Sequence, residues 1–333
     1  MFSNFFKSLY HEFISFWGLN DVVRIFQSGH FEKLLTLDGI LAFISPVLPF
    51  LLLIEIIRAL VYKKFKIEDY KVPFLIFVFN RFVSRFISIA AISFCIAVLE
   101  KQALLKTTFT WYWLIYGYIV WEFSHFVYHY LAHKVRLFWC LHSTHHAPES
   151  MNLSVSYAHF FLEGPYADVI RTSICILAGV NPALLFLIMF IDGTWGGFIH
   201  IGENLLKDAR LGFFNRLILT PSHHRVHHGR NPLYMDTNFC NLLNIWDRLF
   251  GTLQQEELDN PIDYGITRKV DSQNVWDVYF GEIIFLARDI KNAGSIKNKF
   301  LYIFMPPGWS HTGDHKTAKM IRKKLLEEQR LKS

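Results

Sequence analysis

Histidine is the residue type most able to carry chemistry in this chain, because its copies are numerous and closely spaced. Twelve of the sixteen histidines lie between residues 125 and 228. Steps of three and four residues place imidazoles on one face of a helix. In the HxxHH group at 142–146 the last two side chains are about 100° apart around the helix, so one motif can serve two neighbouring metal ions. The pattern predicts a binuclear, nitrogen-rich metal site.

The paired motifs supply the candidate metal ligands, and the same residues are the candidate catalytic residues. They are His129, His133, His142, His145, His146, His224, His227 and His228. His125 extends the first motif by one more turn, one turn deeper in the membrane, and His159 is an isolated candidate. Either of these two histidines could equally be a structural residue.

Ligand type does not choose the metal, since imidazole binds iron, zinc and copper. Zinc needs three or four ligands and activates water, whereas eight or more histidines beside a hydrocarbon phase favour two redox irons that activate O2 against a C–H bond. The sequence contains neither HExxH nor the Glu-x-x-His pairs of soluble di-iron bundles. We therefore predict two iron ions, with O2 as co-substrate.

Apolar segments must position these histidines, and they are long enough to enter a bilayer. The chain is 52% hydrophobic and 19% charged, with a mean hydropathy of +0.24. The candidate segments are residues 39–62, 82–99, 109–131, 169–180 and 183–199. Asn181 and Pro182 separate the last two, which predicts a helical hairpin. The expected fold is an all-α integral membrane protein with four or five membrane helices or hairpin segments and a cytoplasmic histidine-rich di-metal cap.

Lysines at 63, 64 and 66 place the end of the first segment in the cytoplasm by the positive-inside rule. The second segment then leaves the cytoplasm and the third returns, so the active site faces the cytoplasm. A bacterial cytoplasmic membrane is preferred over the endoplasmic reticulum. We predict an N-terminal interfacial segment at 1–38, a membrane di-iron oxygenase domain at 39–253, a cytoplasmic extension at 254–315 and a basic tail at 316–333.

The net charge of +6 comes mostly from the tail, where seven basic and two acidic residues give +5 over 316–333. The remainder is nearly neutral, which argues against a nucleic-acid surface. The tail suits either a solvated helix or anionic lipid headgroups. The four cysteines are far apart and form no C-x-x-C pair, which indicates free thiols and a reducing compartment.

Together these motifs resemble the fatty acid hydroxylase/sterol desaturase superfamily of integral-membrane di-iron enzymes. The matching residues are Glu122, Tyr128, His129, His133, Phe138, Trp139, His142, His145, His146, TPSHHRVHHGRNP at 220–232, Asp236, Asn238 and IWDRLFGT at 245–252. The late segment and PPGW at 306–309 are most similar to the branch that contains alkylglycerol monooxygenase and its bacterial relatives. The resemblance covers about residues 75–313.

The resemblance implies metal ligands at the eight paired histidines and at His200, with His223 as a further candidate. Glu203 and Asn204, one turn after His200, could complete a coordination sphere directly or through water. It also implies a lipid substrate (fatty acyl, ether lipid, sterol or isoprenoid) and a separate redox partner. No fused cytochrome b5 segment is visible, so electrons are expected from a separate donor, for which a reduced pterin, a ferredoxin and a cytochrome are open alternatives.

The predicted function is therefore hydroxylation of a lipid with O2 and external electrons. A lipid or sterol desaturase of the same superfamily is an alternative, because both reactions begin by removing hydrogen from carbon. A membrane metal transporter or sensor is the non-enzyme alternative; it is disfavoured because no internal repeat is visible. Asp247 and Arg248 form either a buried ion pair or a support for a ligand histidine.

Overall fold

The computed structural model describes the chain except residues 1–9, 11–13, 15–18, 81–82 and 333. The chain divides into two compact units, Met1–Phe65 and Lys66–Ser333. Much of the interfacial segment predicted for 1–38 lies outside the described residues. The domain boundaries predicted at 38, 253 and 315 remain predictions.

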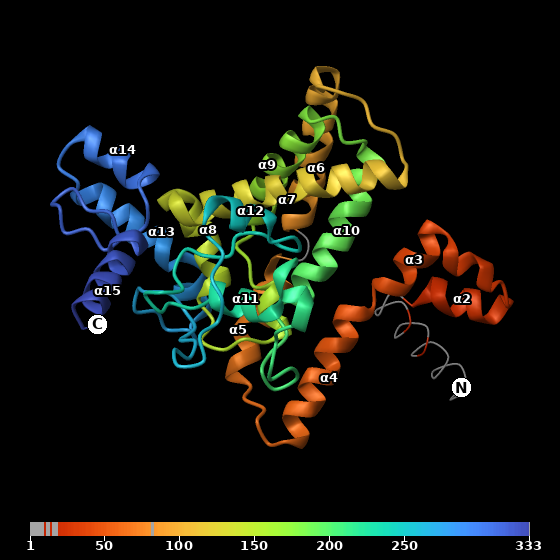
Figure 1. Ribbon diagram of the computed structural model, residues 1–333, viewed down its shortest axis with the longest axis horizontal. Helices are drawn as coiled ribbons and strands as arrows, with labels where there is room; N and C mark the ends of the chain where they lie inside the picture. The colour runs from red at the N-terminus through yellow and green to blue at the C-terminus, as the bar shows by residue number, and fades with distance from the viewer. Residues whose placement is uncertain (1–9, 11–13, 15–18, 81–82, 333) are drawn as a thin grey trace. The chain divides into compact units, whose positions relative to one another are not determined.

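The described residues form helices, and their β structure is limited to two isolated bridges, Ile218 with Leu243 and Gly229 with Tyr264. The α-helices are α2 (Asn20–Ser28), α3 (Leu37–Ile44), α4 (Val47–Val61), α5 (Glu68–Asn80), α6 (Val83–Leu99), α7 (Trp111–Lys134), α8 (Arg136–His146), α9 (Glu163–Leu177), α10 (Pro182–Phe198), α11 (Pro221–His227), α12 (Ile245–Phe250), α13 (Val275–Asn292), α14 (Ile296–Phe304) and α15 (Ala318–Lys332). The short 3-10 helices are η1 (Phe31–Leu35), η2 (Glu100–Gln102), η3 (Leu153–Tyr157) and η4 (Gly212–Arg216). Figure 1 shows their order along the chain.

The first unit contains α2, η1, α3 and α4. The sequence predicts one continuous segment at 39–62, but the structure divides it between α3 and α4. Pro46 stands at the division as the N-cap of α4. Proline has no N–H to continue the hydrogen-bond pattern of a helix.

In the second unit the predicted hairpin is present as α9 and α10. The Asn181 side chain accepts hydrogen bonds from Ala183 N and Leu184 N, and Pro182 occupies the first turn, where a missing N–H costs nothing. Gly179 ends the preceding turn with φ +83°, and a Cβ there would lie 2.0 Å from the carbonyl oxygen of Leu105. Only glycine fits this backbone.

Apolar packing joins α7 to this hairpin. The cluster contains Trp121, Cys175, Ile176, Val180, Leu184, Leu185 and Ile188. Gly117 on α7 allows the close approach, because a Cβ there would lie 2.9 Å from Cδ1 of Ile188. Along the other side α9 packs against α6. The C-terminal ends of α7 and α10 and the N-terminal end of α9 thus lie near the same histidine-rich region.

Among the described residues, one stretch is long and apolar enough to cross a membrane by length and composition, Val83–Gln102, which comprises α6 and η2. Pro182–Phe198 is a shorter apolar helix. The number of membrane segments therefore remains a prediction.

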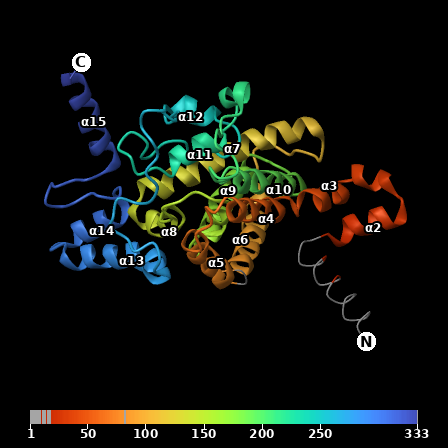
Figure 2. The ribbon, with the colours of Figure 1, turned by 90° about the horizontal axis from the view of Figure 1, so that it is seen from below.

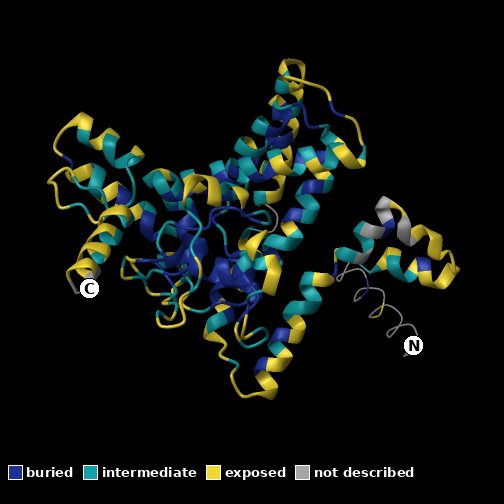
Figure 3. Ribbon diagram, in the orientation of Figure 1, coloured by how far each residue is buried: buried dark blue, intermediate teal, exposed yellow. Residues whose placement is uncertain are grey.

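A polar cap covers the ends of these helices. Buried residues concentrate around α8 and α11, whereas α15 is largely exposed (Figure 3). The helices α13 and α14 pack against α8 (Figure 2), and Leu325 of α15 contacts the small cluster of Val226, Leu233 and Tyr234. The region predicted as an extension after residue 253 therefore forms a wall around α8.

Candidate metal centre

Nine buried histidines form two groups, in each of which the potential ligand atoms lie within 4.8 Å of one another. We call them centre one (His129, His133, His142, His146 and His227) and centre two (His145, His200, His224 and His228). All nine histidines proposed as metal ligands on sequence grounds fall into these groups.

Two short helices serve both centres. On α8, His142 and His146 belong to centre one and His145 to centre two. On α11 and its C-cap, His227 belongs to centre one, while His224 and His228 belong to centre two. The rings of His146 and His228 stack with centroids 4.3 Å apart, so the two centres are direct neighbours.

In centre one, hydrogen bonds at Nδ1 fix which ring nitrogen carries the proton. His129 Nδ1 lies 2.9 Å from Phe239 O, and His142 Nδ1 lies 2.6 Å from Glu163 Oε1. A carbonyl or carboxylate oxygen can only accept, so both Nδ1 atoms donate. In the neutral rings both Nε2 atoms therefore present lone pairs, and they face each other at 3.1 Å.

The same arrangement recurs in centre two. His200 Nδ1 donates to Gly196 O at 2.7 Å, and its Nε2 lies 3.1 Å from His145 Nε2 and 2.9 Å from His224 Nε2. The bond at Nδ1 fixes the His200 tautomer, so its Nε2 lone pair faces two further ring nitrogens, an arrangement that a cation between them would stabilise. The site thus has the donor set and the ring orientation of a metal-binding cluster.

Burial keeps the imidazoles in the neutral form that metals require. It lowers the pKa of His200 to about 3 and holds the pKa values of His145, His224 and His228 well below the usual range. His227 Nε2 is buried without a hydrogen-bond partner among the described residues. A buried, unprotonated nitrogen with no donor nearby is expected where a metal ion binds.

Glu163 connects the two centres. Its Oε1 accepts hydrogen bonds from His142 Nδ1 and, at 2.8 Å, from the Tyr128 hydroxyl. Its Oε2 lies 3.0 Å from His159 Nδ1, and the His159 ring stacks on His145 with centroids 4.2 Å apart. This fully buried carboxylate therefore orients one ring of centre one and supports, through His159, one ring of centre two.

The loop after Tyr234 presents two carbonyl oxygens to centre one. Thr237 O accepts from His227 Nδ1 at 2.7 Å, and Phe239 O accepts from His129. Asp236 and Asn238, on either side of Thr237, both have φ +59°, a conformation that Asp and Asn tolerate better than most residues. Their side chains allow the tight reversal that aims both carbonyls at the histidines.

Two buried carboxylates hold this loop in place. Asp247 accepts hydrogen bonds from the backbone N–H groups of Phe239 and Cys240, both at 2.8 Å, and from the Thr252 hydroxyl at 2.6 Å. Arg248 instead bonds to the Asn244 side chain and to the Arg216 carbonyl. The ion-pair interpretation of Asp247 and Arg248 is therefore wrong, and Asp247 acts through the loop that orients His129.

Glu122 holds the following residues from the opposite side. It lies on α7 and accepts from the backbone N–H groups of Asn241 at 3.2 Å, Leu242 at 2.7 Å and Leu243 at 3.0 Å. The acidic residue of the first motif is thus a structural clamp. It is not one of the potential metal ligands.

The remaining candidates lie outside both centres. His125 Nδ1 is 3.7 Å from Asp192 Oδ2, and His159 contacts Glu163 as described. His223 closes the capping box of α11, where its Nδ1 accepts from Thr220 N at 3.1 Å. Glu203 accepts from the Tyr264 hydroxyl at 2.7 Å, and Asn204 follows it in the same turn.

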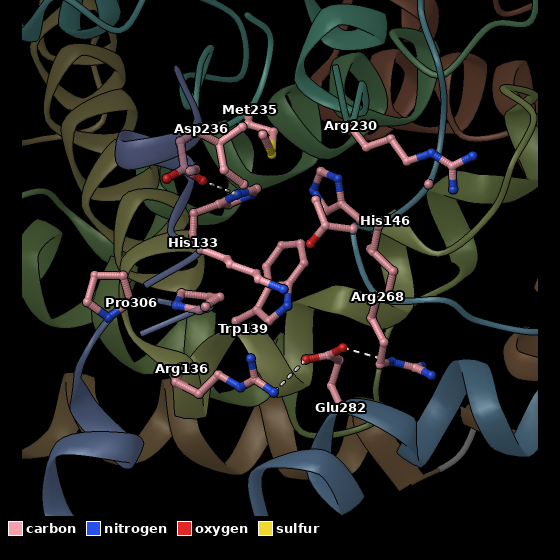
Figure 4. A pocket seen from close by; sticks show the side chains of 18 of the residues that line it. His133, Arg136, Trp139, His146, Arg230, Met235, Asp236, Arg268, Glu282 and Pro306 are labelled. Atoms are coloured by element: carbon pink, nitrogen blue, oxygen red, sulfur yellow. Dashed lines mark hydrogen bonds and ion pairs between the residues drawn. The ribbon is translucent and has the colours of Figure 1, made fainter. Parts of the chain in front are cut away.

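A cavity of about 480 Å³ opens next to centre one. His133, His146 and His227 contribute to its wall, whereas the centre-two histidines do not. Trp139 lies between these histidines and the charged side chains of Arg136, Glu282 and Arg268 (Figure 4). The lining also includes Pro306, Pro307, Gly308, Lys316, Ala318 and Ile321.

Sequence reasoning missed several supporting residues. Glu163 had no assigned role. Its spacing of four residues from His159 could have indicated that the two side chains interact. The carbonyl acceptors Gly196, Thr237 and Phe239 left no signal, because any residue type carries a carbonyl oxygen.

The described helices hold two adjacent histidine groups that could each bind a metal ion, and comparisons with known proteins indicate the family. Residues 114–252 match the family model described as fatty acid hydroxylase. Alkylglycerol monooxygenase from Danio rerio is 30% identical over 204 residues, which cover 61% of this chain and 43% of that protein. The human alkylglycerol monooxygenase is 28% identical over 292 residues, 82% of this chain and 61% of that protein.

A bacterial relative matches over a shorter stretch. The ornithine lipid hydroxylase OlsE from Rhizobium tropici is 27% identical over 158 residues, 47% of this chain and 46% of that protein. Across these three relatives the aligned part spans 43 to 61% of their own length. No solved structure matches. The family model and these relatives support the fatty acid hydroxylase superfamily.

Proposed function

We propose that this protein is a membrane-bound di-iron oxygenase that hydroxylates a lipid. The observation that carries the proposal is the pair of unprotonated Nε2 atoms of His129 and His142, which face each other at 3.1 Å in a group of five histidines. Relatives named as a monooxygenase and as a lipid hydroxylase support the same chemistry.

Iron is favoured over zinc for centre one. Structural and catalytic zinc sites are usually tetrahedral, with three or four protein ligands, and centre one offers five. Cis ligands around a six-coordinate ion with metal–nitrogen bonds of about 2.1 Å are about 3.0 Å apart, whereas tetrahedral ligands are about 3.4 Å apart. In centre one, His142 Nε2 lies 3.1 Å from Nε2 of both His129 and His146, which is closer to the spacing of the higher coordination number.

When bound, the irons would supply oxygen activation: one atom of O2 enters a C–H bond and the other leaves as water, with two electrons and two protons from an external donor. The protein's own residues hold and shield this site. Glu163, Thr237 O and Phe239 O keep the protons of three rings at Nδ1. Burial of all nine histidines limits the access of bulk water to the cavity beside centre one.

A membrane location is supported by the outward apolar face of α6. Only 11% of its most apolar 18-residue stretch is buried inside the protein. The side chains of Phe86, Ile89 and Phe94 are exposed. The core helix of a soluble protein would bury such residues. The active site then lies at the cytoplasmic ends of the helices, within reach of a soluble electron donor.

The test combines metal analysis with lipid mass spectrometry on the purified full chain. His227→Ala and His228→Ala should each lose bound iron and the O2-dependent product, because each removes a buried ligand from one centre. His311→Ala is the control, since this exposed histidine bonds only to the Tyr302 hydroxyl among the contacts described. A product with one added oxygen atom indicates hydroxylation, and loss of two hydrogens indicates desaturation. Full iron content in both variants would refute the ligand assignment.

A further inference from the structure

The elements η4 and α12 carry an exposed apolar surface, and α12 packs against α7 (Figure 2). Six large apolar side chains of this surface are about half exposed or more. They are Phe213, Phe214, Leu217, Ile245, Leu249 and Phe250, and we call them the η4–α12 surface. Single exposed apolar side chains are common on soluble proteins, whereas a set gathered on neighbouring elements marks an interaction site.

Hydrogen bonds hold η4 and α12 side by side. Ile218 and Leu243 form an antiparallel bridge. The side chain of Asn244, the N-cap of α12, donates to the Ile218 carbonyl at 3.1 Å. Arg248 of α12 donates to the carbonyl of Arg216 in η4 at 2.6 Å. The exposed side chains of the two elements therefore belong to adjoining parts of one surface.

Aromatic contacts place α12 beside the middle of α7 and not beyond its end. Trp246 Nε1 donates to the Ile119 carbonyl at 3.3 Å, and the Phe250 ring stacks on Phe126 with centroids 4.9 Å apart. Ile119 and Phe126 are eight and fifteen residues after the first residue of α7, a rise of about 12 and 22 Å. At this depth α12 shares the environment of α7.

The outward side of α7 is apolar over the same length. Tyr112, Ile115 and Ile119 follow one another at helical spacing, and all three are exposed. Under the proposed function α7 enters the bilayer, so α12 and its neighbour η4 then lie at the depth of the lipid. The η4–α12 surface continues the part of α7 that meets the bilayer.

The exposed charges of these two elements are of one sign. Their charged residues are Arg216, Asp247 and Arg248. Asp247 is buried, whereas both arginines are exposed. An arginine beside apolar side chains can keep its guanidinium at the headgroups while its stem covers apolar area. Each basic group near an anionic leaflet contributes about 1 kcal/mol. Aromatic and aliphatic side chains next to arginines, without an exposed carboxylate among them, suit a lipid surface.

We propose that the η4–α12 surface docks on the bilayer, with Phe213, Phe214 and Leu249 at the boundary of the acyl chains and with Arg216 and Arg248 at anionic headgroups. The histidine cap is thereby held against the membrane beside α7. The proposal rests on the proposed function, because that function places α7 in the membrane.

The docking surface is connected to centre one through α12. Asp247 of this helix accepts from the N–H group of Phe239, whose carbonyl accepts from His129 Nδ1. The Phe250 ring stacks on Phe126, which contacts Phe239 in turn. Contact with the bilayer therefore fixes the position of a helix on which the orientation of His129 depends.

Spin labels on the full chain test this inference in vesicles of phosphatidylcholine and phosphatidylglycerol. Phe213→Cys and Leu249→Cys place a nitroxide at side chains that are 66% and 67% exposed, so neither change threatens the fold. Leu258→Cys is the matched control, because Leu258 is 85% exposed and lies between Glu257 and Asp259, outside the surface. The four native cysteines are buried, and the unmodified protein treated with the same reagent corrects for any label on them.

Power-saturation EPR then measures the access of two relaxing agents to each nitroxide: O2, which partitions into lipid, and a neutral nickel chelate, which stays in water. We expect high O2 and low nickel access at 213 and 249, and the reverse at 258. Nickel access at 213 and 249 as high as at 258 would refute the proposal, because the surface would then face water. Low access of both agents would also refute it, since another protein or a second copy would then cover the surface.

The contribution of the arginines is tested by omitting phosphatidylglycerol. The label at 213 should lie deeper in the anionic vesicles than in pure phosphatidylcholine. Arg216→Gln should reduce this difference, and Lys319→Gln, which makes the same charge change on the exposed surface of α15, should retain it. Equal depth in both kinds of vesicle before any arginine is changed would refute the role of the headgroups.

The EPR measurement separates this inference from the proposed function, because it needs neither iron nor turnover. If the labels at 213 and 249 face water while a lipid is oxidised with O2, the docking proposal fails and the oxygenase proposal stands. If they lie in lipid while no iron-dependent oxidation occurs, the docking proposal stands and the oxygenase proposal fails.

Discussion

Replacing Glu163 by glutamine should weaken metal binding at centre one more than at centre two. The carboxylate accepts from His142 Nδ1 at 2.6 Å and from Tyr128 at 2.8 Å through the same oxygen. An amide oxygen in that place can still accept from both groups, but it carries no charge, so both hydrogen bonds become weaker. The His142 ring is then held less firmly with its Nε2 lone pair directed into centre one.

The magnitude follows from the type of bond that is lost. A hydrogen bond to a charged group contributes about 1.5–3 kcal/mol. Loss of a partner that orients a metal ligand typically costs about 10- to 100-fold in metal affinity, which corresponds to about 1.4–2.8 kcal/mol. The two estimates agree, so we expect a loss of that size at centre one. Centre two depends on Glu163 only through the stacking of His159 on His145, and its affinity should change less.

Competition with a chromogenic chelator, using Zn²⁺ as a redox-silent probe, measures the affinities of both centres. Glu149→Gln is the matched control, because Glu149 is near the cluster but half exposed and paired with Arg230 at 3.5 Å. Two sites with unchanged affinity in Glu163→Gln would show that the carboxylate does not orient His142. An equal loss at both centres would show that Glu163 stabilises the cap as a whole.

Three further changes test other parts of the argument. Gly179→Ala should lower the free energy of unfolding in detergent by at least about 2 kcal/mol, because residue 179 has a positive φ and the new methyl group would collide with a carbonyl oxygen. Gly193→Ala is the control: its added methyl group meets nothing within 4 Å, so it should be neutral or stabilising. Asp247→Asn should lower the iron content, because it loosens the loop that orients the His129 ring. Its iron content is compared with that of Asp247→Glu, expressed at a similar level. The melting temperature of the chelator-treated protein should fall from pH 7 to pH 5, because burial lowers the pKa of His200 to about 3 and of His223 to about 4 from 6.5. At low pH the unfolded chain therefore binds more protons than the folded protein, and the free energy of unfolding falls by about 1.4 kcal/mol per pH unit for each such histidine. A constant melting temperature would contradict this.

Local sequence patterns predicted four helices of the second unit, α6, α7, α9 and α10. The stretch 82–99 corresponds to α6, 109–131 to α7, and the Asn181–Pro182 break to the hairpin. These features depend on apolar runs and on capping residues within a few positions. The first unit shows the limit of the same reasoning, because a single proline inside an apolar run divided α3 from α4.

The histidine groups were predictable in composition and partly in arrangement. The spacing on α8 was enough to expect neighbouring side chains to serve different ions, and the structure places His145 and His146 in different groups. The supports were not predictable, because Phe239 reaches His129 across 110 residues and Glu122 reaches Leu243 across 121. The charged side chains that line the cavity likewise join α8 to α13, which the sequence placed in a separate extension.

The ring orientations connect metal binding to the stability of the cap. Without a cation, the Nε2 lone pairs of His129 and His142 repel each other at 3.1 Å, while burial opposes the protonation that would relieve them. Carbonyl and carboxylate partners on the opposite nitrogens prevent the rings from changing tautomer. Holding these lone pairs together therefore destabilises the folded protein, and binding of the metal ions stabilises it by removing the repulsion. We expect the loops that bear Thr237 and Phe239 to exchange their amide hydrogens faster once the ions are removed, whereas the amides of α6 should not respond.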